Sequence, residues 1–184
     1  CKSKKKNCEL KLSKFFYEKC DNCKTVYVSN PLKEKFLLKK YQDSKGDKLY
    51  IKMMRTGYMK KYNDLLYKKY LKILKRLGVS KGNLIDIGCG SGEFLIYLKK
   101  HHPKFNIFAT EHIGYAKKII EKIIHKKNFF FQKRIQELKI VNFYNIISLW
   151  GVLEHVRDPI GFLSKCKIML KKKGLILILI PNYD

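Results

Sequence analysis

Residues 84–95 read LIDIGCGSGEFL, a short apolar stretch followed by a glycine-rich turn and then by helix-forming residues. Apolar residues 84–87 predict a buried strand, and the apolar spacing after Glu93 predicts a helix that begins there. Glycine has no Cβ, so the chain can turn sharply and a ligand can approach its backbone. In an open parallel sheet, ligands bind where such a strand ends. The segment therefore predicts an α/β fold with a ligand site at the turn.

Strands and helices alternate through the rest of the chain. Continuous apolar strands between helices indicate a parallel sheet that is covered on both faces. At 184 residues the chain can form one core with a small appendage. We expect helices over residues 66–77, with Gly78 as the stop, over 116–124, and from Asp158-Pro159 to Gly174. The last of these helices would bury Leu163, Cys166 and Leu170. Residues 30–62 read as a polar connection, and further strands are expected at 105–110, 129–131, 144–150 and 175–180.

The glycine spacing and two acids describe the ligand. Gly88, Gly90 and Gly92 follow the pattern G-x-G-x-G, whereas dinucleotide sites prefer G-x-G-x-x-G. Asp86 would repel a pyrophosphate but suits a ligand that carries an ammonium and a sulfonium. Glu111 follows the second strand, where a carboxylate can accept hydrogen bonds from ribose hydroxyls. These features favour a nucleoside-cofactor site over a structural turn or an NAD site.

Three motifs in this order resemble class I S-adenosylmethionine-dependent methyltransferases. Residues 84–95 look like motif I of that family, and residues 150–159 (WGVLEHVRDP) resemble the "LEH…DP" segment of one large subgroup. Pro181-Asn182 after the fifth strand fits the same subgroup, many of whose members modify sugars or small metabolites. The resemblance covers about Leu71 to the end. It implies a Rossmann-like sheet, S-adenosyl-L-methionine as cofactor, and a helix and an antiparallel strand pair after the fifth strand, so the chain reads as a C-terminally incomplete fragment.

The resemblance also assigns roles to residues. Asp86 would order the motif I loop and meet the methionyl end, and Glu111 would hold the ribose. Trp150 would pack against adenine or the substrate entrance. The stretch 132–135 offers no acid for the adenine amino group, so that contact would come from the backbone near Ile135 or be absent. The cofactor-binding residues predicted in this way are Asp86, Gly88, Cys89, Gly90, Gly92, Glu111, Ile135 and Trp150.

His155 is the candidate catalytic residue. Methyl transfer needs alignment, and a base as well when the acceptor is a hydroxyl. In this fold the loop after the fourth strand faces the cofactor's methyl group. Alternatively, Glu154 and His155 only order that loop or cap the next helix. Quinone and phenol O-methyltransferases of the subgroup usually carry an acid where this chain has Gly151, which disfavours that substrate class and a catalytic metal. We expect a small-molecule or carbohydrate-like acceptor, including a sugar nucleotide or polysaccharide.

The N-terminal cysteines predict a zinc site. Cys20 and Cys23 form a C-x-x-C knuckle, the spacing that places two thiolates on one tetrahedral zinc. Residues 20–31 (CDNCKTVYVSNP) resemble the second knuckle of some methyltransferases of the subgroup. By that resemblance, Cys1 would belong to a first knuckle, and Cys8 would be a bystander or a replacement ligand. The predicted structural zinc ligands are therefore Cys1, Cys8, Cys20 and Cys23.

The charge leaves the partner open. The chain has 41 Lys+Arg against 15 Asp+Glu, a net charge of +26. This balance suits a nucleic-acid or anionic-surface partner, but it also arises by compositional drift in AT-rich genomes. An RNA methyltransferase, or a nucleic-acid-binding zinc protein with a catalytically silent Rossmann domain, therefore stand as alternatives.

Three segments are predicted: a zinc-ribbon-like segment (1–35), connecting and cap helices (36–78), and the S-adenosylmethionine-binding domain (79–184). The first residue is not Met, so the natural start is expected to be missing. No apolar run approaches the ~18 residues of a membrane helix, and no secretory signal opens the chain. A cytoplasmic location without a membrane span is expected.

Overall fold

The computed structural model describes residues 6–33, 35–37, 39 and 47–181, so Cys1 and Asn182 lie outside the described residues. The chain divides after Lys39 into a small N-terminal unit and a larger unit that extends to Pro181. The three predicted segment boundaries stay predictions.

The N-terminal unit is an antiparallel meander of β1 (Lys6–Leu12), β2 (Phe15–Cys20) and β3 (Val26–Val28). Every residue of β1 is exposed, so backbone pairing rather than a core carries this sheet. The C-x-x-C segment turns the chain between β2 and β3, where Lys24 N donates to Cys20 O at 2.9 Å. Lys24 adopts a φ of 61°, in the left-handed region that tight turns need.

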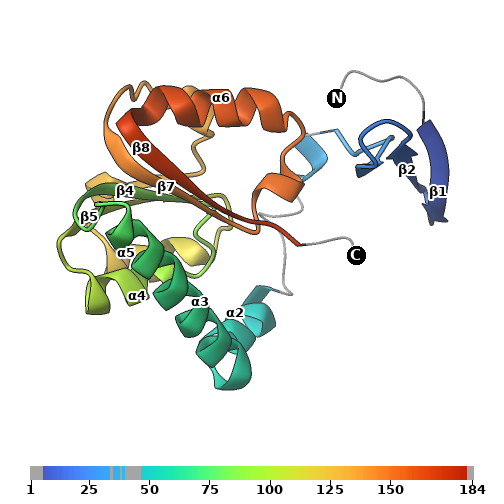
Figure 1. The fold of residues 1–184 in the computed structure, drawn as a ribbon. Coiled ribbons are helices and arrows are strands. Elements are labelled where there is room, and N and C mark those ends of the chain that lie inside the picture. The colour runs from blue at the N-terminus through green and yellow to red at the C-terminus, as the bar shows by residue number, and fades with distance from the viewer. Residues whose placement is uncertain (1–5, 34, 38, 40–46, 182–184) are drawn as a thin grey trace. The chain divides into compact units, whose positions relative to one another are not determined.

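The larger unit is a doubly wound α/β structure (Figure 1). Its five strands are all parallel and lie in the order β6-β5-β4-β7-β8. The chain adds β5 and β6 on one side of the central strand β4, and then β7 and β8 on its other side. The direction of winding therefore reverses at β4, which is the switch point where ligands bind in such sheets. The α/β class and the five-stranded parallel sheet are confirmed. The strands are β4 (Gly82–Ile87), β5 (Phe105–Glu111), β6 (Phe129–Phe131), β7 (Tyr144–Trp150) and β8 (Leu170–Leu179).

Helices cover both faces of the sheet, as Figure 1 shows. Side chains alternate along each strand, so Leu84 and Ile85 enter different cores. Leu84 faces α3 and α4, whose residues Leu74 and Leu98 are almost fully buried. Ile85 belongs to the second core, on the side of α6. The helices are α2 (Asp47–Arg55), α3 (Gly57–Arg76), α4 (Glu93–His101), α5 (Ala116–Ile123) and α6 (Pro159–Met169), with short 3-10 turns at Lys126–Asn128, Ile135–Glu137 and Leu153–His155.

Among the described residues, none of the helices has the length and apolarity needed to cross a bilayer.

Two predicted segments were wrong in extent. Residues 30–62 were expected to form a polar connection, but they include α2 and the first turns of α3. None of the apolar side chains described in this segment is fully buried, so the segment lacks the buried stripe that marks a core-facing helix. The last helix was expected to reach Gly174 but ends at Met169, and β8 starts at Leu170. Lys173, in β8, has a φ of 65°, which a right-handed helix does not permit. The buried residues of α6 are Phe162, Cys166 and Met169.

Candidate functional site

The glycine turn leaves β4 at Ile87 and enters α4 at Glu93, and its three glycines meet different surroundings. A Cβ on Gly88 would lie 2.8 Å from Val152, in the loop after β7. A Cβ on Gly92 would lie 2.6 Å from Ile120 of α5. Gly90 has a φ of 55° and no atom within 4 Å of where a Cβ would stand. Gly88 and Gly92 therefore allow close packing, whereas Gly90 exposes backbone to open space that a ligand can enter.

Glu111 joins the end of β5 to this turn. Its carboxylate accepts the N–H groups of Gly90 and His112, both at 2.6 Å, and of Ile113 at 3.0 Å. The N–H of Gly88 donates to the Thr110 carbonyl at 3.0 Å. The structure thus brings the predicted ribose acid and the predicted glycine loop together at the carboxyl edge of the sheet.

Asp86 lies buried beneath the turn. The hydroxyl of Ser148, on the neighbouring strand β7, donates to Asp86 Oδ1 at 2.6 Å. Burial raises the pKa of Asp86 to about 8, and the nearby charges of Glu111 and Glu93 act in the same direction, against the hydrogen bond from Ser148. Asp86 is therefore protonated at neutral pH, and the negative charges of Glu111 and Glu93 would stabilise a cation bound at the turn.

Arg55 of α2 contacts the glycine turn and the start of α4, which the sequence did not reveal. Its Nε lies 3.0 Å from Glu93 Oε1, and its Nη2 donates to the carbonyl of Ser91. The hydroxyl of Ser91 also donates to Glu93 Oε1. Because α2 was read as part of a connection, no pattern associated Arg55 with a turn more than thirty residues later. The guanidinium ties α2 to the start of α4.

Trp150, Ile135 and Cys89 are three further residues that were predicted to bind the cofactor, and their side chains are packed as follows. The Trp150 ring packs edge-on against three aromatic rings of α3 and α4, at centroid distances of 5.2 Å to Tyr67, 5.3 Å to Tyr70 and 5.0 Å to Phe94. Its indole nitrogen is buried and has no hydrogen-bond partner among the described residues. The side chain of Ile135 is buried in the core on the α6 side, and Cys89 is buried in the core on the α3 and α4 side.

His155 lies at the end of the 3-10 turn Leu153–His155, in the loop that follows β7. The loop begins at Gly151, whose N–H donates to Leu179 of β8 at 2.9 Å. Val152 packs against Gly88, which holds the loop beside the glycine turn. His155 and Glu154 themselves are exposed.

The predicted four-cysteine zinc site is not supported. Cys1 lies outside the described residues, and within the described part of the chain no three His, Cys, Asp or Glu side chains are grouped as metal ligands. In the β1–β2 pair, Cys8 stands opposite Glu18, and Lys6 stands opposite Cys20. Cys8 therefore lies two residues along the strand from the position opposite Cys20. Cys23 is near Thr25, whose hydrogen bonds, with a smaller one from Cys20, lower the pKa of the Cys23 thiol to about 7.

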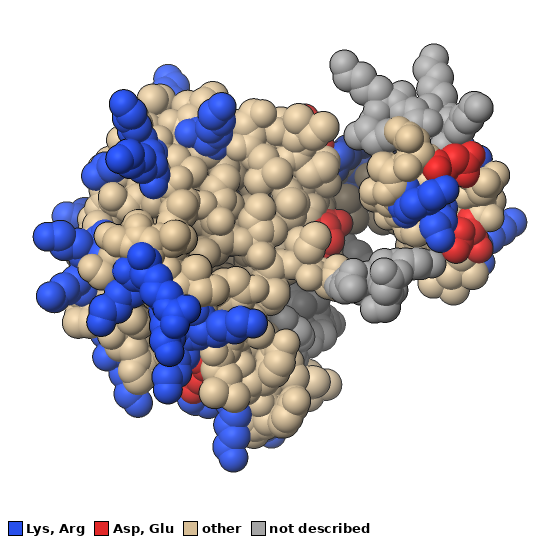
Figure 2. All heavy atoms as spheres, viewed as in Figure 1, with Lys and Arg blue, Asp and Glu red and all other residues tan. Residues whose placement is uncertain are grey.

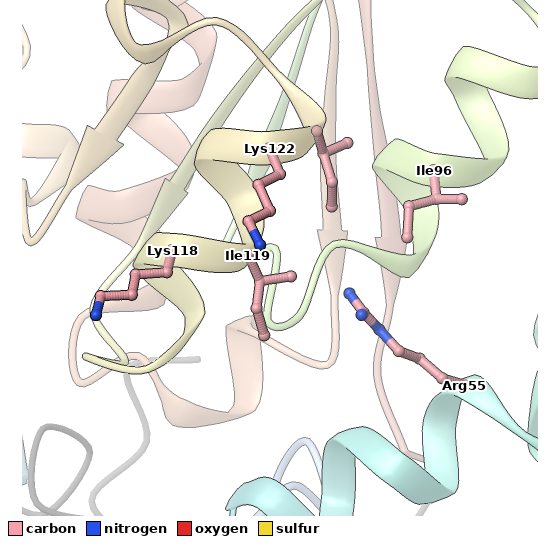
Figure 3. Close-up of a pocket in the computed structure, with 6 residues that line it drawn as sticks. Arg55, Ile96, Lys118, Ile119 and Lys122 are labelled. Carbon is pink, nitrogen blue, oxygen red and sulfur yellow. The ribbon is translucent and has the colours of Figure 1, made fainter.

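A shallow pocket lies outside the predicted site. It has a volume of about 300 Å³ and is lined by Arg55 of α2, Ile96 of α4 and residues of α5. Figure 3 shows Arg55 reaching from α2 toward α4, with Lys122 on the α5 side. Its lining includes none of the predicted cofactor or catalytic residues.

The comparisons with known proteins agree with this fold. A family model described as "Methyltransferase domain" matches residues 58–184, more than half of the chain. The chain therefore belongs to the methyltransferase-domain family, and its fold is that of class I S-adenosylmethionine-dependent methyltransferases.

Among individual relatives, the ubiquinone biosynthesis O-methyltransferase of Pasteurella multocida (strain Pm70) is 25% identical over 54% of this chain. The match covers 46% of that protein, so the chain spans about half the length of this curated relative. Two solved structures share the fold. A Methanococcus maripaludis protein described as an S-adenosyl-L-methionine-dependent methyltransferase is 23% identical, with a TM-score of 0.61, over 80% of this chain and 65% of that one. The plantazolicin methyltransferase BpumL, in complex with SAH and a pentazolic desmethylPZN analog, is 18% identical, with a TM-score of 0.60, over 76% and 55%.

Proposed function

We propose that this chain binds S-adenosyl-L-methionine at the glycine turn and belongs to an enzyme that transfers a methyl group to a small-molecule acceptor. The observation that carries this proposal is the Glu111 carboxylate bonded to the N–H of Gly90, beside the buried Asp86. This arrangement joins a carboxylate that can bond ribose hydroxyls to a backbone that a ligand can approach.

The residues fit such a cofactor in shape and charge. Open space beside Gly90 admits a ligand, and the negative charges of Glu93 and Glu111 suit its positive charge. Glu111 would hold the ribose, and Asp86 would order the turn that receives the methionyl end. When bound, the cofactor supplies an electrophilic methyl group on its sulfonium. With Ile135 buried, any adenine contact near it would be made by the backbone.

His155 would act as the base for a hydroxyl acceptor. Its loop is held beside the glycine turn by Val152, and an exposed imidazole can exchange protons with solvent between turnovers. The alternative, that His155 only orders the loop, makes a different prediction. In a screen of small hydroxylated acceptors with methyl-labelled cofactor, His155→Gln should lower turnover by roughly 100-fold if the imidazole is the base, at unchanged cofactor affinity.

The acceptor class is inferred from the activities for which two relatives are named. One acts in ubiquinone biosynthesis and another is a plantazolicin methyltransferase. Neither name supports the carbohydrate-like acceptor that the sequence suggested, and that part stays a prediction. Gly151 has a φ of 64°, and a Cβ there would lie 3.4 Å from a Glu154 oxygen, so an acid at this position would be strained.

Calorimetric titration of S-adenosylhomocysteine tests the cofactor site. The wild-type chain should bind saturably, and Glu111→Ala should abolish binding. Glu121→Ala on α5 removes the same charge away from the turn and should bind like wild type. Circular dichroism of each protein separates loss of binding from loss of folding. Absence of binding by well-folded wild-type protein would contradict the proposal.

Zinc binding by the N-terminal unit also stays a prediction. Elemental analysis of the purified chain, with Cys20→Ser and Cys23→Ser variants beside it, measures it directly. Only zinc that is lost in these variants would count in its favour.

A further inference from the structure

The helices α2 and α3 carry large apolar side chains that the fold leaves in water. On α3 the exposed fractions are 78% for Tyr58, 46% for Tyr62 and 67% for Leu65. On α2, Leu49 and Met53 are exposed by 66% and 54%. The spacing of Tyr58, Tyr62 and Leu65 puts them on one face of α3, and the two tyrosine rings stack with centroids 6.4 Å apart.

This face lies opposite the one that the core uses. Tyr67, Leu71 and Leu74 are the buried residues of α3, and they project to the other side of the helix. Core packing therefore explains one face of α3 and leaves the other unexplained. Scattered exposed apolar residues are common, but neighbouring ones on adjacent turns indicate an interaction surface.

Positive charge borders the same surface. The 20 residues of α3 include seven Lys or Arg and one acid, Asp64, which pairs with Lys60 at 2.7 Å. Lys61, Lys68 and Lys72 follow the same helical row as Leu65, and all three are exposed. In Figure 2 the part of the larger unit where Figure 1 places α2 and α3 shows uncharged surface beside a group of blue side chains.

We propose that this outer face of α3 docks on an anionic lipid membrane. Apolar side chains that lie in the headgroup boundary, with lysines at their edge, are the arrangement of helices that lie in a membrane interface. Tyrosine suits that depth because its ring is apolar and its hydroxyl remains hydrated. Each lysine near the surface gains from the negative potential of anionic lipids. The proposal does not depend on methyltransferase activity.

Two other partners fit less well. A symmetric contact with a second copy would bring the Lys61, Lys68 and Lys72 row against its own kind, in a chain of net charge +26. RNA phosphates could bind these lysines, and bases could stack on the tyrosines, but Leu65 would stay in water. An anionic membrane satisfies both the apolar residues and the charges.

The test is co-sedimentation of the full chain with vesicles. We expect binding to phosphatidylcholine vesicles that contain phosphatidylglycerol, and little binding to phosphatidylcholine alone. The double variant Tyr62→Ser and Leu65→Ser should weaken binding by roughly tenfold or more, and so should Lys61→Gln, Lys68→Gln and Lys72→Gln together. All five residues are exposed, so the variants should fold.

A matched control separates this surface from general lysine charge. Lys104→Gln, Lys126→Gln and Lys127→Gln remove the same charge from exposed positions before β5 and β6 and should bind like wild type. An equal loss in this control would overturn the proposal, as would a lack of binding to the anionic vesicles.

A second readout reports the depth of the helix. Tyr62→Trp places an indole on the docking face, and brominated lipids should quench it, whereas the native Trp150 is packed among aromatic rings. Binding to single-stranded RNA that competes with the vesicles, without any quenching by brominated lipid, would replace the membrane with a nucleic-acid partner.

Discussion

The Glu111 carboxylate accepts the N–H of Gly90 at 2.6 Å, so a side chain at the end of β5 holds a turn that begins at the end of β4. The same carboxylate accepts the N–H of His112 and of Ile113. One acid therefore links the loops after two neighbouring strands. These three hydrogen bonds give Glu111 a structural role in addition to the proposed ribose contact.

Replacing this acid should cost both stability and affinity. Glu111→Gln keeps the size of the side chain but removes the charge that three N–H groups face. We expect the free energy of unfolding to fall by about 1–3 kcal/mol, because charge-assisted hydrogen bonds are lost. Urea denaturation measures the change, and a variant as stable as wild type would show that the link carries no energy.

The glycines should separate binding from folding. Gly90→Ala adds a methyl group to open space at a positive φ, so it should cost about 1 kcal/mol of stability yet weaken S-adenosylhomocysteine binding strongly. Gly92→Ala also places its methyl group 2.6 Å from Ile120, so overpacking should add about 1–3 kcal/mol to the loss. Thermal melts and calorimetry on both variants check this order. The reverse order would mean that Gly90 does not face the ligand.

Asp86 should make stability depend on pH. Its pKa is raised to about 8 in the folded chain, so the folded state holds a proton that the unfolded chain loses near pH 4. The free energy of unfolding should therefore fall as pH rises from about 4 to about 8, by at most about 1.4 kcal/mol per pH unit. Asp86→Asn should remove this part of the slope. Denaturation curves across this pH range, for wild type and variant, give the comparison; identical slopes would count against the raised pKa.

Arg55 should order the glycine turn, although it lies 36 residues before Ser91 in the chain. Arg55→Gln removes the cation beside Glu93 and a donor to the Ser91 carbonyl. Because the pair is partly exposed, we expect a stability loss of only about 1 kcal/mol. Hydrogen exchange at the turn amides should nevertheless become faster. Arg76→Gln, at the exposed end of α3, is the control and should leave this exchange unchanged.

The sequence alone determined the sheet and the position of the turn. Apolar runs along residues 84–180 predicted all five strands, although β8 begins five residues earlier than expected. A helix was predicted to begin at Asp158-Pro159, and α6 does begin there, with the Asp158 carboxylate accepting the N–H of Gly161 at 3.0 Å. Such features are local, so the residues that produce them are neighbours in the chain.

Tertiary structure alone decided which distant residues meet. Arg55 reaches the glycine turn only because α2 lies beside α4, and Trp150 joins Tyr67 only because α3 packs on the same face of the sheet. The sequence did not show, for a related reason, that the apolar outer face of α3 is exposed. Spacing along a helix reveals an apolar face, but only the packed structure shows whether the core or the solvent receives it.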